Sequence, residues 1–162
     1  MIEDIAEKTV DILTRLDIDT VAPSFSAGLG RLDAATTRDL DAAGIPAPLR
    51  ELIRIRASQL NGCAYCVNMH TRDALAGGDT VARVAAVSVW RESPFFTQRE
   101  RAALALTETI TRAVDTHVPQ SDWNEAAALF QPAELGALVA LIVVINAWNA
   151  VGVSTRAWTP EA

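Results

Sequence analysis

The chain is poor in several residue types: it has two cysteines, eight glycines, seven prolines and only 6% aromatic residues. Positive charge is also scarce, because fourteen Lys and Arg stand against twenty Asp and Glu, which gives a net charge of −6. A phosphate backbone would be repelled by such a chain, so we expect no nucleic-acid partner. Charged residues amount to 21% and hydrophobic residues to 50%, and this balance excludes an intrinsically disordered protein.

Long apolar segments are missing as well. The longest nearly uninterrupted run covers residues 135–145, whereas a membrane crossing needs about twenty residues, and Asn146 and Asn149 follow directly. Residues 1–8 are acidic and amphipathic, unlike the basic and then apolar start of a secretion signal. We therefore expect a cytoplasmic protein without a membrane partner. The apolar run should be a helix that is buried in the core or at a subunit interface.

Alanine, by contrast, is abundant, with 29 residues in the chain. It is the strongest helix former, and no strand-like alternation of useful length accompanies it. The 162 residues fit one domain, residues 1–162, around a single core. The sequence therefore predicts an all-α, single-domain helical bundle.

Capping residues and helix breakers divide the chain into helices. An amphipathic first helix is predicted by apolar residues at helical spacing, namely Ile2, Ile5, Ile12, Leu13 and Leu16. Residues 21–44 are expected to be interrupted by Pro23 and by the glycines at positions 28 and 30. Five later helices are expected at about Pro46 to Leu60, Cys63 to Gly77, Asp79 to Trp90, Thr97 to Val114 and Ser121 to Phe130. A last helix is expected to begin at Pro132.

One group of residues is suited to thiol chemistry. Cys63, Cys66 and His70 lie at positions i, i+3 and i+7, so they share one face of a helix that starts at Cys63. The free backbone N–H groups and the helix dipole at such a start favour a thiolate and lower the pKa of a cysteine. An imidazole at position 70 can accept or relay a proton. Glu51, on the preceding helix, would orient that imidazole if the turn at residues 61–62 places the two helices side by side.

This pattern of residues resembles that of a known family. Glu51, the Cys63-Ala64-Tyr65-Cys66 segment and His70 match the Glu…Cys-x-x-Cys-x-x-x-His signature of the alkylhydroperoxidase D-like proteins, within the carboxymuconolactone decarboxylase superfamily. The resemblance extends over about residues 49–114 and includes the segments 58–63 and 96–101. It implies an all-helical subunit that assembles into trimers or hexamers, and an antioxidant enzyme that reduces hydroperoxides with a redox-active disulfide.

The resemblance also implies a role for each residue. Cys66 would be the peroxidatic thiolate that becomes a sulfenic acid, and Cys63 would be the resolving thiol that converts it to a disulfide. Glu51 and His70 would form the proton relay. No bound cofactor is expected, and an external dithiol of a thioredoxin-like or lipoyl kind would have to reopen the disulfide, because the chain has no third cysteine. Tyr65 stands where the best-studied members have histidine, and it can line the pocket, donate a hydrogen bond or simply pack.

Two structural interpretations compete with this one. The two cysteines can be small core residues, as free cysteine often is. Alternatively, Cys63, Cys66, His70 and Glu51 supply enough ligands for zinc, but ligands spaced along one regular helix converge poorly on a tetrahedral centre. We therefore expect no metal.

Two functional alternatives also stay open. A decarboxylase acting on a lactone acid belongs to the same superfamily, and it would need a cationic clamp for the substrate carboxylate, for which Arg54, Arg56 and Arg72 are the candidates. A non-enzymatic redox sensor would use the disulfide to alter assembly. Peroxide turnover separates an enzyme from such a sensor.

The apolar content of the chain predicts its assembly independently of the cysteines. A helix that is hydrophobic all round must be covered on every side, and a 162-residue monomer has little interior for a chain that is half apolar. Neighbouring subunits can provide that cover. We expect a symmetric homo-oligomer in which the C-terminal helix contributes to subunit contacts or to the core beneath them.

Overall fold

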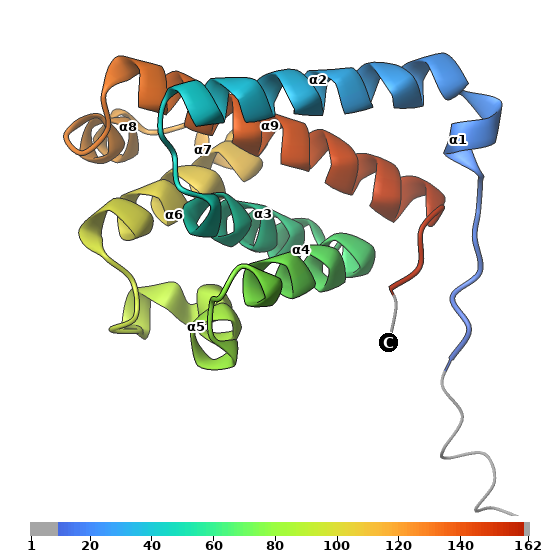
Figure 1. The fold of residues 1–162 in the computed structure, drawn as a ribbon, viewed down its shortest axis with the longest axis horizontal. Helices are drawn as coiled ribbons and strands as arrows, with labels where there is room; N and C mark the ends of the chain where they lie inside the picture. Colours follow the sequence, from blue (N-terminus) through green and yellow to red (C-terminus); the bar gives the residue numbers. More distant parts are fainter. Residues whose placement is uncertain (1–9, 161–162) are drawn as a thin grey trace, which may run out of the picture.

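Every regular element of the computed structural model, which describes residues 10–160, is a helix, as the composition predicts (Figure 1). The long helices are α2 (Pro23–Ala42), α3 (Ala47–Asn61), α4 (Ala64–Ala76), α6 (Gln98–Thr111) and α9 (Pro132–Thr155). The short ones are α1 (Ile18–Val21), α5 (Val81–Ala86), α7 (Ala113–Thr116), α8 (Gln120–Ala127) and the 3₁₀ helix η1 (Val87–Glu92). The predicted all-α class is confirmed for this part of the chain.

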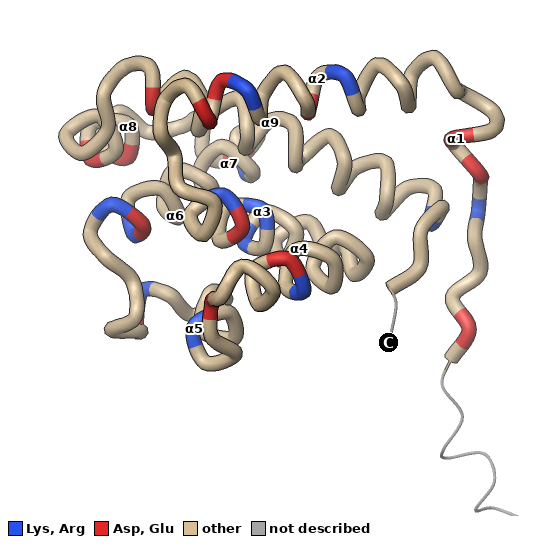
Figure 2. The backbone as a smooth tube through the Cα atoms, in the orientation of Figure 1, with Lys and Arg blue, Asp and Glu red and all other residues tan. Residues whose placement is uncertain are grey.

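Helix α9 forms the centre of the bundle. It packs against α2, α3 and α6, and Figure 1 shows α2 lying along it. Leu138, Leu141 and Ile142 are fully buried in these contacts. Charged positions are nearly absent from α9 in Figure 2, because Glu134 in its first turn is the helix's single charge. A helix of this composition needs cover on several sides, and its neighbours supply much of it.

By length and composition, α9 is the one helix between residues 10 and 160 that could cross a bilayer. The core helix of a water-soluble protein passes the same test, and α9 buries 39% of its most apolar window in contacts within the fold. It continues past the apolar run through Asn146 and Asn149 to Thr155, because both amides find hydrogen-bond partners inside the fold.

Helices α3 and α4 form a hairpin that positions the candidate site. Helix α3 ends at Asn61 because Gly62 adopts a left-handed φ of +71°, which residues with a Cβ atom rarely adopt. Cys63 then caps α4, which ends at Ala76 before the next glycine pair. These boundaries agree with the prediction.

The predicted first helix needs correction. Residues 10–17 are not helical. The backbone N–H groups of Arg15 and Leu16 donate instead to the Thr155 carbonyl at the end of α9, at 2.8 and 3.1 Å. The contact with α9 thus replaces local helical hydrogen bonds. Ile12, Leu13 and Leu16, which were expected in the first helix, therefore lie in a non-helical segment. Ile2 and Ile5 lie outside the described residues.

The predicted interruption of residues 21–44 is also wrong, because α2 is one long helix. Pro23 occupies its first turn, where backbone N–H groups have no partner within the helix, so the N–H that proline lacks costs no hydrogen bond. The glycines at positions 28 and 30 lie within the helix without breaking it. Leu29 and Leu40 are buried against the bundle, and this packing outweighs the low helix propensity of glycine.

Boundaries in the second half are partly as predicted. The capping box of Thr97 and Glu100 and the start of α9 at Pro132 are confirmed. Thr80 rather than Asp79 caps α5, since Asp79 instead pairs with the guanidinium of Arg83. Three predicted helices have other bounds. The helix expected to reach Trp90 becomes the 3₁₀ helix η1 at Val87, and the helix expected to reach Val114 ends at Thr111, before α7. Helix α8 spans Gln120–Ala127, whereas a helix from Ser121 to Phe130 was expected.

Candidate active site

Cys63 and Cys66 stand at the N-terminus of α4 and are joined by a disulfide. The backbone N–H of Cys66 donates to Sγ of Cys63 at 3.3 Å. Both residues are buried, with 2% and 3% of their surface exposed. After reduction, the same N–H group and the helix dipole would stabilise a thiolate at Cys63. The geometry therefore suits a disulfide that opens and closes.

His70 follows Cys66 by one turn of α4, and Glu51 reaches it from α3. Nδ1 of His70 lies 2.9 Å from one carboxylate oxygen of Glu51, and Arg54 donates to the other oxygen. Burial alone would raise the pKa of Glu51, but the hydrogen bond to His70 and the charge of Arg54 outweigh it and hold that pKa below its ordinary value. Glu51 is therefore an anion that accepts a hydrogen bond from Nδ1–H of His70, and the other ring nitrogen, Nε2, takes no part in this contact.

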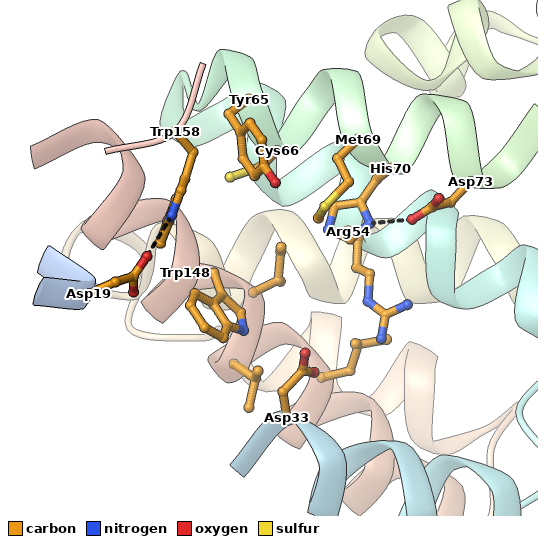
Figure 3. A pocket seen from close by; sticks show the side chains of 13 residues that line it. Asp19, Asp33, Arg54, Tyr65, Cys66, Met69, His70, Asp73, Trp148 and Trp158 are labelled. Atoms are coloured by element: carbon orange, nitrogen blue, oxygen red, sulfur yellow. Dashed lines mark hydrogen bonds and ion pairs between the residues drawn. The ribbon is translucent and has the colours of Figure 1, made fainter. Parts of the chain in front are cut away.

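A cavity of about 500 Å³ opens beside these residues (Figure 3). Cys66, His70 and Arg54 all contribute to its wall, and so does Tyr65. Glu51 and Cys63 stand behind this wall rather than in it. The structure thus brings the four predicted site residues together, with one sulfur and the imidazole facing the cavity.

Cys63 faces the backbone of α9 instead of the cavity. A Cβ atom added to Gly152 would lie 3.0 Å from Sγ of Cys63 and 3.7 Å from the ring of Trp158. Only a residue without a side chain allows α9 to approach the sulfur this closely. Gly152 is therefore part of the disulfide's immediate surroundings, although its position in the sequence gives no sign of this.

Three aromatic rings form one side of the cavity. Trp158 packs against Tyr65 and against Trp148, with ring centroids 5.7 Å apart in each pair. The indole N–H of Trp158 donates to Asp19 at 3.1 Å, so the segments at the two ends of the described chain meet here. The sequence analysis did not assign Trp148, Trp158 or Asp19 to the site, because nothing local predicts that residues 139 positions apart will meet.

A buried amide network holds the turn before Cys63 against α9. The side-chain amide of Asn61 donates to Asn146 at 2.8 Å and to Asn149 at 3.0 Å, and Asn149 donates to the Ser58 hydroxyl at 2.9 Å. Asn149 and Ser58 are completely buried. These hydrogen bonds link α3 to α9 and thereby fix the start of α4, a positioning role that the sequence analysis did not assign to Asn146 or Asn149.

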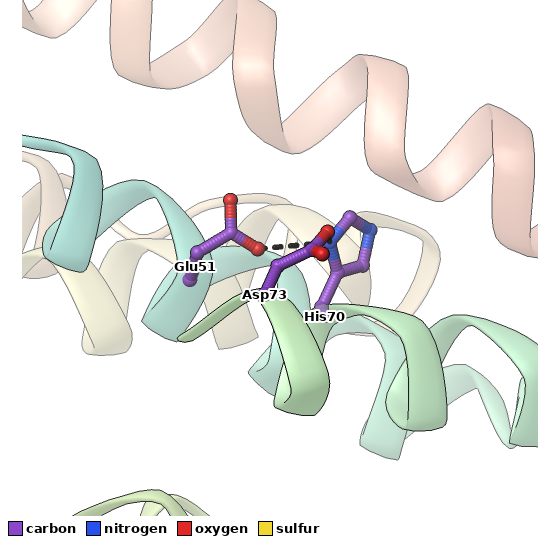
Figure 4. A group of neighbouring side chains, drawn as sticks. All are labelled: Glu51, His70 and Asp73. Atoms are coloured by element: carbon purple, nitrogen blue, oxygen red, sulfur yellow. Dashed lines mark hydrogen bonds and ion pairs between the residues drawn. The ribbon is translucent and has the colours of Figure 1, made fainter. Parts of the chain in front are cut away.

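The same region contains ligand atoms that a metal ion could use. Glu51, His70 and Asp73 each offer one such atom, and these atoms lie within 4.8 Å of one another (Figure 4). Both oxygens of Glu51 are already engaged, one by Arg54 and one by His70. A metal ion at this place would compete with Arg54 and His70 for the Glu51 carboxylate. The zinc interpretation loses its thiolate ligands here, because the two sulfur atoms are bonded to each other.

Comparison with known proteins places the chain in a family. The model of the carboxymuconolactone decarboxylase family matches residues 23–109, which begin in α2 and thus earlier than the resemblance seen in the sequence. The uncharacterized protein YdfG of Bacillus subtilis (strain 168) is 39% identical over 105 residues, which are 65% of this chain and 71% of YdfG. The uncharacterized protein YnjA of Escherichia coli (strain K12) is 31% identical over 98 residues, and the match spans about half of YnjA, 53%.

Solved structures agree with this placement. One is ATU0492 from Agrobacterium tumefaciens, a protein of unknown function that is named as a candidate antioxidant defence protein AhpD. It superposes on this chain with a TM-score of 0.86 and 30% sequence identity, over 93% of this chain and 100% of ATU0492. The debrominase Bmp8 shares the fold, with a TM-score of 0.72 and 24% identity over 86% of this chain and 73% of Bmp8. The chain therefore belongs to the carboxymuconolactone decarboxylase family, and its fold is that of the alkylhydroperoxidase D-like proteins.

Proposed function

We propose that the protein is an oxidoreductase that reduces hydroperoxides with Cys66 and Cys63. One observation carries this proposal: Cys66, disulfide-bonded to Cys63, lines the same cavity as His70, whose other side is hydrogen-bonded to Glu51. A nucleophilic sulfur, a proton acceptor and an anion that orients it therefore meet at one accessible surface. Family membership supports a peroxidase-like or decarboxylase-like role, and the cysteine pair favours the first.

The first chemical step takes place at Cys66. Nε2 of His70 accepts the thiol proton, and the thiolate attacks the terminal oxygen of the hydroperoxide, the one that carries hydrogen, so that an S–O bond forms and the O–O bond breaks. The alkoxide leaves with the proton that His70 returns, which yields an alcohol and a sulfenic acid on Cys66. Glu51 stabilises the imidazolium that exists between these two proton transfers.

The second and third steps restore the reduced enzyme. The thiol of Cys63 attacks the sulfenic sulfur of Cys66, water leaves, and the disulfide forms. An external dithiol then attacks Cys66, the sulfur that faces the cavity, and Cys63 leaves as a thiolate beside the Cys66 N–H. The second thiol of the reductant displaces Cys66, so that the reductant carries away the disulfide. A thioredoxin-like or lipoyl protein fits this requirement by resemblance.

Steady-state consumption of cumene hydroperoxide with dithiothreitol tests the proposal. Wild type should turn over repeatedly, and Cys66→Ser should not. Glu51→Gln should slow oxidation of the thiol by roughly a hundredfold while the circular dichroism spectrum stays unchanged, and Glu125→Gln on α8 is the matched control. One stoichiometric oxidation without turnover would support a redox sensor instead.

Decarboxylation of a lactone acid is the second candidate function. It is favoured by the family match and by Arg54, whose side chain lines the cavity and could face a carboxylate. Arg56 does not serve this purpose, since it binds Glu108 at 2.7 Å, and Arg72 lines a neighbouring hollow. Arg54 is itself paired with Glu51, and decarboxylation would leave the disulfide without a task. Release of carbon dioxide from a lactone acid by Cys66→Ser would support this alternative.

Assembly and location are further parts of the proposal. We expect a homo-oligomer, trimeric or hexameric by resemblance, that works in the cytoplasm. Val143 and Val153 of α9 support the assembly, because 51% and 41% of their surfaces are exposed on a strongly apolar helix. A second subunit would cover this face.

A further inference from the structure

The cavity beside Cys66 is apolar on two sides. Leu141, Val144 and Ile145 of α9 line it, and the rings of Tyr65, Trp148 and Trp158 complete the wall. Figure 3 shows Trp148 and Trp158 on the side of the cavity opposite His70. Flat or bulky apolar groups gain most from such a wall, because aromatic rings offer large contact areas and favourable edge and offset geometries.

Negative charge surrounds the same cavity. Asp19 of α1, Asp33 of α2 and Asp73 of α4 line it, and in Figure 3 Asp33 reaches toward the cavity from α2. Asp73 lies 4.0 Å from Nδ1 of His70, and 59% of its side chain is exposed to solvent. The three carboxylates come from three different helices, so they approach a ligand from several directions.

The positive groups nearby are already committed. Arg54 is the arginine in the wall, and its guanidinium donates to Glu51. The imidazole of His70 is oriented by the other oxygen of Glu51. A ligand carboxylate would meet three aspartates and compete with Glu51 for Arg54, whereas an uncharged ligand would meet no such repulsion.

We propose that this cavity selects uncharged organic molecules with an aromatic or similarly bulky apolar group and discriminates against carboxylates. This inference rests on the proposed function for its chemistry: the substrate is then an uncharged organic hydroperoxide, reduced to its alcohol at Cys66. The organic group lies against Trp148 and Trp158, and the hydroperoxide points to Cys66 and His70. Asp19, Asp33 and Asp73 exclude anionic hydroperoxides.

A matched pair of substrates tests the charge selection. Cumene hydroperoxide and its 4-carboxylate differ by one negative charge, and kcat/KM of the wild type should be higher for the uncharged compound by roughly tenfold. The preference should shrink at high ionic strength. Asp33→Asn should lower the ratio about threefold, whereas Asp39→Asn, which removes the same charge from an exposed position of α2, should leave it unchanged. Equal kcat/KM values for the two compounds in wild type would overturn the proposal.

A second comparison tests the aromatic wall. The ratio of kcat/KM for cumene hydroperoxide over hydrogen peroxide should fall roughly five- to tenfold in Trp158→Ala and be largely retained in Trp158→Phe. Trp158 lies beyond the last helix, so its replacement leaves the helical core intact, which circular dichroism can verify. Trp123→Ala on α8 is the control and should leave the ratio unchanged. An unchanged ratio in Trp158→Ala would contradict this account of the wall.

Ligand binding without turnover separates this inference from the proposed function. The product alcohol, 2-phenyl-2-propanol, should quench the tryptophan fluorescence of the oxidised protein at lower concentration than its 4-carboxylate. If no hydroperoxide is turned over but the alcohol is preferred, the proposed function fails and the selectivity of the cavity stands. If turnover occurs and the carboxylate is equal or better, the selectivity fails and the proposed function stands.

Discussion

Nδ1 of His70 lies 2.9 Å from Oε2 of Glu51, although nineteen positions separate the two residues in the chain. The left-handed Gly62 makes this contact possible, because it turns α4 back along α3. The contact between Glu51 and His70 therefore depends on the geometry of one hairpin, and Cys66 lies on the same hairpin one turn away from His70. The chemistry proposed for the site follows from this short stretch of the fold.

We expect Glu51 to stabilise the protein more at neutral pH than at acid pH. His70 and Arg54 hold the pKa of its carboxyl group below the ordinary value, even though burial opposes them. The stabilisation is therefore fully present above the ordinary carboxyl pKa and is lost as the pH falls through the lowered folded-state value. Urea unfolding of wild type and Glu51→Gln at about pH 7 and about pH 3 measures this. The free energy of unfolding of wild type should exceed that of Glu51→Gln by less at the acid pH than at the neutral pH. An equal difference at both pH values would contradict the account.

Gly152→Ala should destabilise the protein, because the new methyl group would lie 3.0 Å from Sγ of Cys63. Overpacking of this kind costs about 1–3 kcal/mol in the free energy of unfolding. Gly136→Ala on the same helix is the control, since nothing lies within 4 Å of its added Cβ atom. That control should be stabilising by about 0.5–1 kcal/mol, and equal effects of the two substitutions in chemical denaturation would refute the close contact.

Asn149→Ala should cost about 2–3 kcal/mol in the free energy of unfolding, because it removes the amide that donates to the buried Ser58 hydroxyl and one of the two acceptors of the Asn61 amide. Asn124→Ala on the exposed face of α8 should change stability by less than about 0.5 kcal/mol. Thermal or urea unfolding compares the two. A small loss in Asn149→Ala would show that the amide network does not hold the hairpin.

The local features of the site were predictable from the sequence, and the distant ones were not. The stop at Gly62, the cap at Cys63 and the alignment of Cys66 with His70 follow from glycine conformation and helical spacing. The contact of Glu51 with His70 follows once the hairpin is assumed. Each of these inferences spans few residues and depends on one element or one turn.

The walls of the cavity come from elements that meet only after folding. Trp158 and Asp19 are joined by a hydrogen bond between the two ends of the described chain. Helix α2 was not predicted as continuous, because Pro23 and two glycines have low helix propensity, yet burial of Leu29 and Leu40 overrides that propensity. Tertiary contacts of this kind leave no periodic pattern in a single sequence.

Assembly can be tested at α9. Sedimentation equilibrium at micromolar concentration should give a mass that is a multiple of the 17.4 kDa subunit. Val143→Asp should dissociate the assembly, because a carboxylate would replace a half-exposed valine in the expected interface. Circular dichroism shows whether the variant subunit stays folded. A wild-type protein that sediments as a 17.4 kDa species would contradict the predicted oligomer.

Trapping of the sulfenic acid tests the central claim, that Cys66 attacks the hydroperoxide, most directly. Reduced Cys63→Ser is mixed with one equivalent of cumene hydroperoxide and dimedone, and the labelled residue is located by mass spectrometry. The account predicts a dimedone adduct on Cys66 and one cumyl alcohol per subunit, because Cys66 faces the cavity. It also predicts no adduct on Cys63 in Cys66→Ser. An adduct on Cys63 in Cys66→Ser, with Cys63→Ser unreactive, would contradict it.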